Sequence, residues 1–64
     1  MERESELLTT AEAAAYIRMK PQTLNKWRSQ GKGPYFVRIG GAVFYRLAEL
    51  DSFITVNITP PERS

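Results

Sequence analysis

The sequence contains neither cysteine nor histidine in its 64 residues. Without these residue types it has no disulfide, none of the common zinc sites and neither a Ser-His nor a Cys-His nucleophile pair. No apolar run approaches the ~18 residues of a transmembrane helix, and no secretory signal pattern is visible. These absences argue against an enzyme and against a bound metal or cofactor. They favour a small soluble protein of the cytoplasm.

Acidic residues are missing from the middle of the chain. Between Ala13 and Ala48 there is no Asp or Glu, yet this span holds seven of the nine cations: Arg18, Lys20, Lys26, Arg28, Lys32, Arg38 and Arg46. The acids lie nearer the two ends: Glu2, Glu4, Glu6, Glu12, Glu49, Asp51 and Glu62. A cationic block between acidic ends is typical of a protein that binds a polyanion. The alternative, charges that segregate without function, is disfavoured by the number of cations.

The segment from Arg18 to Gly31 predicts a sharp turn and then a short helix. Pro21 suits the first helical position, and Gly31 suits the left-handed position just past the end. Leu24 and Trp27 share one face of this helix. Its other faces carry amide, hydroxyl and cationic groups, which are the types that contact base edges and phosphates. The alternative for this segment is an ordinary solvated helix face.

A first helix is predicted over about residues 10–17. Thr9 and Glu12 have the spacing of a capping box at its start. Only residues 18–20 separate it from the second helix, at about residues 21–30. Two helices this close in sequence predict a helix-turn-helix.

A β-hairpin is predicted where two β-branched and aromatic runs flank Gly40-Gly41. A two-residue turn would place Arg38 beside Val43 and Tyr45. A three-residue turn, residues 40–42, would separate apolar from cationic side chains. One face would then carry Val37, Ile39, Val43 and Tyr45, and the other Phe36, Arg38, Phe44 and Arg46. The three-residue turn is favoured, and it makes outward-facing Phe44 a candidate protein contact.

A third helix is predicted over about residues 47–55, with Leu47, Leu50 and Ile54 on its inner face and Phe53 beside them. Residues 1–6 and 56–64 lack periodicity and are predicted to be a flexible start and a flexible tail. The domain therefore spans residues 7–55. Its expected class is small α+β: a helix-turn-helix, a two-stranded hairpin and a C-terminal helix.

A larger pattern runs through the whole of this domain. It consists of Leu8-Thr9, Ala13-Ala14, Tyr16-Ile17, Met19, Thr23-Leu24, Trp27, Gly31, Pro34, Val37, Gly40-Gly41, Val43, Tyr45-Arg46, Leu50 and Phe53-Ile54. In this order and spacing the chain resembles the excisionase-type, MerR-like winged helix-turn-helix domains of phages and mobile elements, which include the AlpA-like regulators.

The resemblance implies sequence-specific binding of double-stranded DNA, with the second helix in the major groove and the hairpin as a wing. It implies either an excisionase, which shapes DNA for an integrase during recombination, or a small AlpA-like transcriptional regulator. Such a protein is encoded by a bacterium or phage and lies in the cytoplasm with the nucleoid. An integrase or another protein is the expected partner, through the wing or the tail, and no membrane is involved. The resemblance is also compatible with copies of the protein associating cooperatively on DNA.

Three positions depart from the family pattern. Arg18 stands where the family commonly has glycine, and a left-handed Arg18 would be strained by roughly 1 kcal/mol. Lys20 stands where the family often has a capping Ser or Thr, and lysine cannot cap the helix. The wing tip, residues 40–42, carries no cation, so the wing's contacts with DNA are expected from Arg38 and Arg46 on its strands.

The candidate DNA-binding residues come from the second helix, its flanks and the wing. Base contacts are expected from Gln22, Asn25 and Lys26, because Asn and Gln pair with adenine and Lys with guanine. Phosphate contacts are expected from the remaining candidates: Lys20, Thr23, Arg28, Lys32, Arg38 and Arg46. For Arg28, exposure to solvent without a DNA contact is an equal alternative. Trp27 is either a core anchor or a stacking residue for single-stranded nucleic acid, and its spacing from Leu24 favours the core. The remaining alternative is a protein-interaction adaptor that does not bind DNA.

Overall fold

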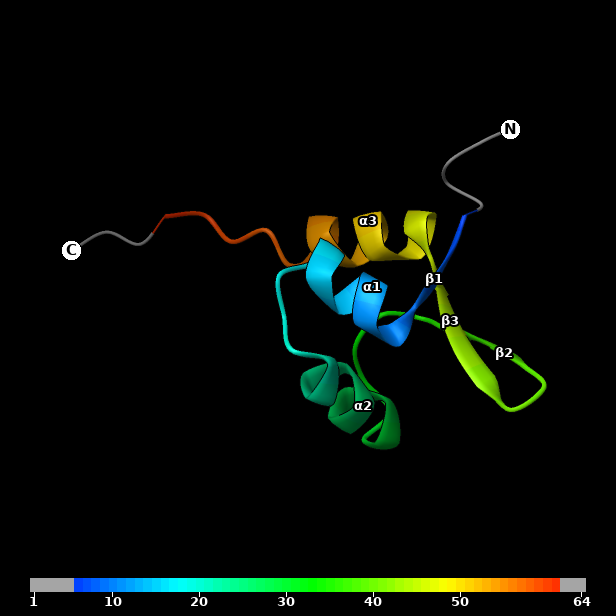
Figure 1. Ribbon diagram of the computed structural model, residues 1–64. Coiled ribbons are helices and arrows are strands. Elements are labelled where there is room, and N and C mark those ends of the chain that lie inside the picture. The colour runs from blue at the N-terminus through cyan, green and yellow to red at the C-terminus, as the bar shows by residue number, and fades with distance from the viewer. Residues whose placement is uncertain (1–5, 62–64) are drawn as a thin grey trace.

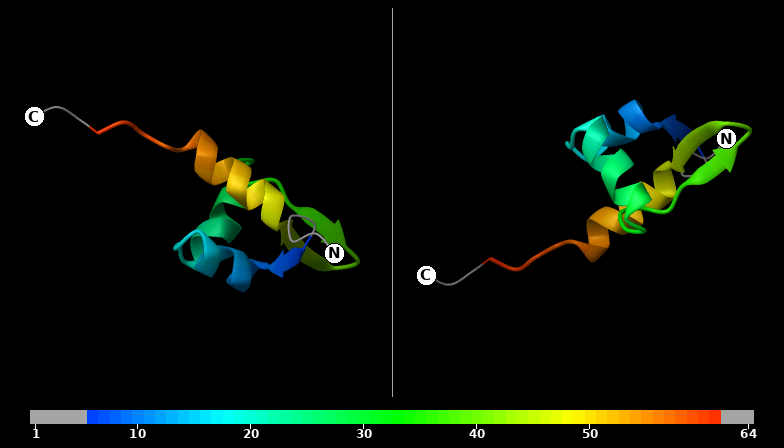
Figure 2. Two further views of the ribbon diagram at one scale, coloured as in Figure 1. Left: turned by 90° about the horizontal axis from the view of Figure 1, so that it is seen from above. Right: turned by 90° about the horizontal axis from the view of Figure 1, so that it is seen from below.

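The computed structural model describes residues 6–61 of the chain. Its elements are, in order, β1 (Leu7–Thr9), α1 (Thr10–Tyr16), α2 (Pro21–Ser29), β2 (Val37–Ile39), β3 (Ala42–Arg46) and α3 (Leu47–Val56). Helix α1 contacts both α2 and α3, and the β2–β3 hairpin extends to one side of the helices (Figures 1 and 2). This is the expected small α+β, winged helix-turn-helix architecture. Residues 1–5 of the predicted flexible start and residues 62–64 of the predicted flexible tail lie outside the described residues.

Helix α1 begins with the predicted capping box. The backbone N–H of Glu12 donates to Thr9 Oγ1 at 3.1 Å, and the backbone N–H of Thr9 donates to Glu12 Oε1 at 2.9 Å. Two backbone donors that the helix itself cannot satisfy are thereby paired.

Helix α1 ends in a left-handed turn that is built on arginine. Arg18 has φ +62°, Met19 N–H donates to the carbonyl of Ala14 at 2.8 Å, and Arg18 N–H donates to that of Ala15 at 3.2 Å. This pair of bonds is a Schellman motif, in which the left-handed residue is usually glycine. The strain that the sequence predicts at Arg18 is therefore present.

Helix α2 has a weak start and a well-formed end. Its N-cap residue, Lys20, makes no side-chain capping bond, as predicted, and Pro21 occupies the first turn. At the other end Gly31 has φ +73°, and Lys32 N–H donates to the carbonyl of Trp27 at 2.9 Å. The end of α2 thus repeats the Schellman turn of α1 with the residue type that the motif prefers.

The core is built on small residues of α1 that let the other elements approach. Its fully buried members are Ala13, Ala14, Leu24, Tyr45 and Leu50, and Leu8, Ile17, Trp27 and Val43 pack against them. Trp27 is a packing residue, as predicted, although it is only partly buried. Its ring centroid lies 5.6 Å from that of Phe53. Ile54, predicted to face inward, is 41% exposed, whereas Phe53, predicted beside it, is partly buried and packs against Trp27.

The sheet has three strands rather than the predicted two. Its order is β1-β3-β2, and both neighbouring pairs are antiparallel. Strand β1 was not predicted as a strand, because three residues are too few to show a periodicity. Its pairing also depends on β3, which is distant in sequence.

The predicted three-residue hairpin turn is wrong. Ile39 lies opposite Ala42, so the turn consists of Gly40 and Gly41 alone. Of these two, only Gly40 has a positive φ, +61°, as in a type II′ turn. Strand β2 is an edge strand whose Arg38 and Ile39 are both exposed, so burial does not impose the predicted separation of its faces, and the glycine turn sets the register.

The two-residue turn changes the side-chain faces of the wing. Opposite residues in an antiparallel pair share a face. Arg38 therefore shares the inner face with Val43 and buried Tyr45, whereas Val37 shares the outer face with Phe44. Phe44 faces outward, as predicted, but it shares that face with apolar side chains rather than with Arg38.

Candidate nucleic-acid interface

The rotation of α2 is fixed by one residue on its inner side. Leu24 is only 1% exposed and belongs to the core that α1 builds. With Leu24 inward, the side chains of Gln22, Asn25 and Lys26 are exposed, and Thr23 is partly buried. The structure therefore leaves the three predicted base-contacting side chains accessible on one element.

Arg28 connects α2 to the rest of the domain. Its Nη1 donates to the hydroxyl of Tyr45 at 3.2 Å, and its Nη2 donates to Oδ1 of Asn25 at 2.9 Å. Its guanidinium carbon also lies 5.7 Å from the centroid of the Phe36 ring, within the range of a cation–π interaction. All three contacts are to uncharged groups, so the positive charge of Arg28 is held in place without being neutralised.

Phe36 joins the wing to this helix. The guanidinium carbon of Arg38 lies 5.8 Å from the Phe36 centroid, and the rings of Phe36 and Tyr45 are 6.3 Å apart at 56°. One aromatic ring thus has a guanidinium from α2 and another from β2 beside it. The predicted hairpin already placed Phe36 and Arg38 on one face, as their i, i+2 spacing requires, but it gave Phe36 no role beside a cation.

Arg46 is not brought together with Arg28 and Arg38. It pairs with Leu7 of β1 and lies on the outer face of the sheet, whereas Arg38 lies opposite Val43 on the inner face. The sequence placed both wing arginines on one face, and the register separates them.

Two of the three lysines of the predicted site lie at opposite ends of α2. Lys20 is exposed at its N-cap and Lys32 is exposed just beyond its C-terminal turn. We use the name cationic face for the exposed or partly exposed cations of α2, its flanks and the inner face of the wing: Lys20, Lys26, Arg28, Lys32 and Arg38. Lysine and arginine side chains that are distributed along a helix and onto a neighbouring strand are suited to contact successive phosphates of a nucleic-acid backbone.

The acids of the helices lie on other elements. Glu12 belongs to α1, and Glu49 and Asp51 belong to α3. Asp51 accepts a hydrogen bond from the hydroxyl of Tyr16 at 2.6 Å, which ties α3 to α1. In Figure 1, α3 runs along the upper side of the molecule, while α2 and the β2–β3 turn lie at its lower side. The acids of α3 therefore lie on the side of the molecule away from α2.

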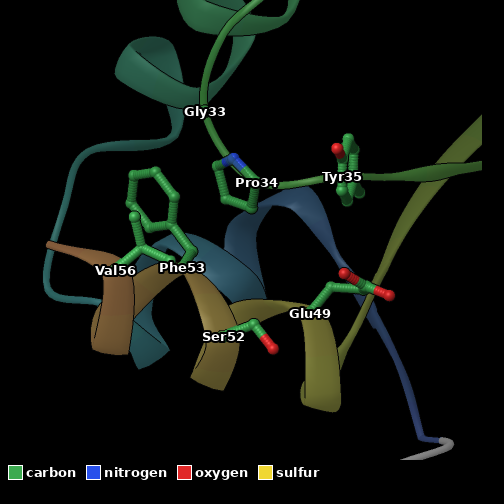
Figure 3. A pocket seen from close by; sticks show the side chains of 7 residues that line it. All are labelled: Gly33, Pro34, Tyr35, Glu49, Ser52, Phe53 and Val56. Atoms are coloured by element: carbon green, nitrogen blue, oxygen red, sulfur yellow. The ribbon is translucent and has the colours of Figure 1, made fainter.

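A pocket lined by residues 33–35 and by α3 offers a different kind of site (Figure 3). Its walls include Pro34, Phe53 and Val56, and Glu49 contributes a carboxylate. None of the nine predicted DNA-binding residues lines it. Within residues 6–61 no group of three or more His, Cys, Asp or Glu side chains is arranged to hold a metal ion. No helix in the same part of the chain is long and apolar enough to cross a membrane.

The chain was compared with known protein families. The family model described as helix-turn-helix domain matches residues 7–56, a range that runs from the first residue of β1 to the last of α3. No curated protein matches the sequence significantly.

Proposed function

This chain belongs to the helix-turn-helix domain family, which implies that it binds DNA, and we propose that it does so as an excisionase-type protein of a phage or mobile element. Domains of this family are typically not enzymes. In this proposal the chain recognises a specific double-stranded site and shapes the DNA for an integrase. It works in the cytoplasm, on the nucleoid.

The observation that carries the proposal is the cationic face. It spans α2 and the wing, and the span of sequence that builds it contains no acid. We assign Gln22, Asn25 and Lys26 to base edges in the major groove, because they are exposed on the helix that follows the turn. The remaining members of the face, with Thr23 at the start of α2, contact phosphates. Arg46 contributes less to DNA binding, because it lies on the outer face of the sheet.

A protein partner is supported by the outer face of the sheet. Leu7 and Ile39 are 42% and 52% exposed there, and both lie on the side of β3 that carries Phe44. We propose this apolar surface of the wing, with the tail beyond α3, as the contact with the integrase. A small AlpA-like transcriptional regulator is the second candidate, because the same surface would serve a protein of the transcription machinery.

Duplex binding measured by fluorescence anisotropy over a series of salt concentrations tests the DNA-binding part. The logarithm of the affinity should fall linearly with the logarithm of salt concentration, as cations of the protein replace counterions. A chain without duplex affinity at low salt would be a protein-interaction adaptor. If an integrase gene lies beside the gene for this chain, an excision assay with that integrase separates the two candidates, because only an excisionase shifts the products from integration to excision.

A further inference from the structure

Asn25 and Arg28 form a fixed pair on the exposed side of α2. They lie one helical turn apart, and the bond from Arg28 Nη2 to Asn25 Oδ1 is 2.9 Å long. The other terminal nitrogen of Arg28 is bonded to the hydroxyl of Tyr45, a residue only 1% exposed. The core therefore holds the guanidinium, and the guanidinium holds the amide of Asn25.

This arrangement determines which atoms of Asn25 are offered to a ligand. A free asparagine pairs with adenine in the major groove by accepting from its N6 amino group and donating to N7. Here one of the two lone pairs of the Asn25 carbonyl oxygen already accepts from a cation, and the other lies beside that cation, while the NH₂ group carries two donors. An adenine amino group in that place would face the N–H groups of Arg28, which are also donors. The pair is thus poorly suited to adenine.

Guanine offers the complementary pattern. Its major-groove edge carries two acceptors, O6 and N7, and no donor. The NH₂ group of Asn25 and the N–H groups of Arg28 that remain unengaged are all donors.

We propose that Asn25 and Arg28 act together as a donor surface that selects guanine, where the sequence alone assigned Asn25 to adenine. This inference rests on the proposed docking of α2 in the major groove. It adds a role to Arg28, which orients the amide of Asn25 as well as contributing charge.

Selection of tight binders from a pool of random-sequence duplexes tests the proposal with the full chain. The base pair that Asn25 and Arg28 contact is identified as the position of the DNA site at which the base preference disappears in Asn25→Ala. In the wild-type selection this position should be guanine. Replacing that guanine by 7-deazaguanine, which lacks the N7 acceptor, should weaken binding about 10-fold. Hypoxanthine at the same position keeps O6 and N7 and should bind as guanine does.

Arg28→Met separates the role of the guanidinium from that of its charge. It releases the carbonyl oxygen of Asn25, so the preferred base should change from guanine to adenine. Lys32→Met is the matched control, since it removes an exposed cation from the same face without touching Asn25. It should weaken binding to all duplexes and leave the preferred base unchanged.

Three results would overturn the proposal: adenine at this position in the wild-type selection, guanine kept by Arg28→Met, or unchanged affinity with 7-deazaguanine. Circular dichroism establishes whether Arg28→Met folds, and if it does not, the modified bases and Asn25→Ala still decide. Sequence-specific binding with adenine at this position would defeat this inference alone. A wild-type chain that binds no duplex would defeat the proposed function with it.

Discussion

The guanidinium of Arg28 donates to the hydroxyl of Tyr45 across 3.2 Å, although one residue belongs to α2 and the other to the central strand of the sheet. Tyr45 is among the most buried large side chains of the described residues. A polar atom of the core thus fixes the place of a cation on the face proposed to contact DNA. Removing the hydroxyl should disturb both stability and binding.

We expect Tyr45→Phe to lower the free energy of unfolding by about 1 kcal/mol, because the ring stays packed and only the hydrogen bond is lost. Duplex affinity should fall as well, since Arg28 loses its anchor. Tyr16→Phe is the control, because it also removes a hydroxyl that bonds to another element, but on α1 and α3. Thermal melting and duplex titration of both variants measure the two effects. An equal loss of duplex affinity in both would exclude a particular role for Tyr45.

Gly33 is expected to resist substitution. Its φ is +91°, and a Cβ there would lie 3.0 Å from both Cβ and Cε3 of Trp27. Backbone strain and the clash with a packed ring together should make Gly33→Ala destabilising by about 2 kcal/mol. Gly41→Ala is the matched control, because no atom lies within 4 Å of the added methyl group and its φ is not positive. Melting temperatures that fall equally in both variants would contradict this account of Gly33.

Arg18→Gly should stabilise the domain by roughly 1 kcal/mol, because glycine adopts the left-handed conformation at φ +62° without the strain of a side chain. The reciprocal change is available at the equivalent turn of α2. Gly31 has φ +73° and open space around it, so Gly31→Ala should cost a similar amount through the backbone alone. Denaturant unfolding of both variants measures this, and a destabilised Arg18→Gly protein would mean that the arginine side chain contributes more than its backbone costs.

The two wing arginines should differ in their effect on DNA binding. Arg38 lies beside Phe36 on the side that carries Arg28, whereas Arg46 lies on the outer face beside Leu7. Arg38→Ala should weaken binding to all duplexes and reduce the magnitude of the salt slope by about 1. Arg46→Ala should change the slope less. If Arg46→Ala has the larger effect on the slope, the DNA lies against the outer face of the wing instead.

Local sequence determined the elements that depend on neighbouring residues. The capping box of Thr9 and Glu12, the helix that begins at Pro21 and the left-handed Gly31 were all predictable, because each involves groups within one or two turns of the chain. The same holds for the inward rotation of Leu24. The concentration of cations between Ala13 and Ala48 was also readable, since charge needs no knowledge of the fold. These features were enough for the fold class and for the choice of α2 as the candidate DNA-reading element.

Tertiary structure decided what depends on residues that are distant in sequence. β1 is a strand only because β3 lies beside it, and the turn at Gly40 set a register that places Arg38 and Arg46 on opposite faces. The sequence could list Arg28 among the cations but could not give its partners. The hydroxyl of buried Tyr45 and the ring of Phe36 reach it only once the sheet has packed against the helices. Packing of separate elements, rather than local propensity, therefore determines which hydrogen-bonding groups this protein presents to a ligand.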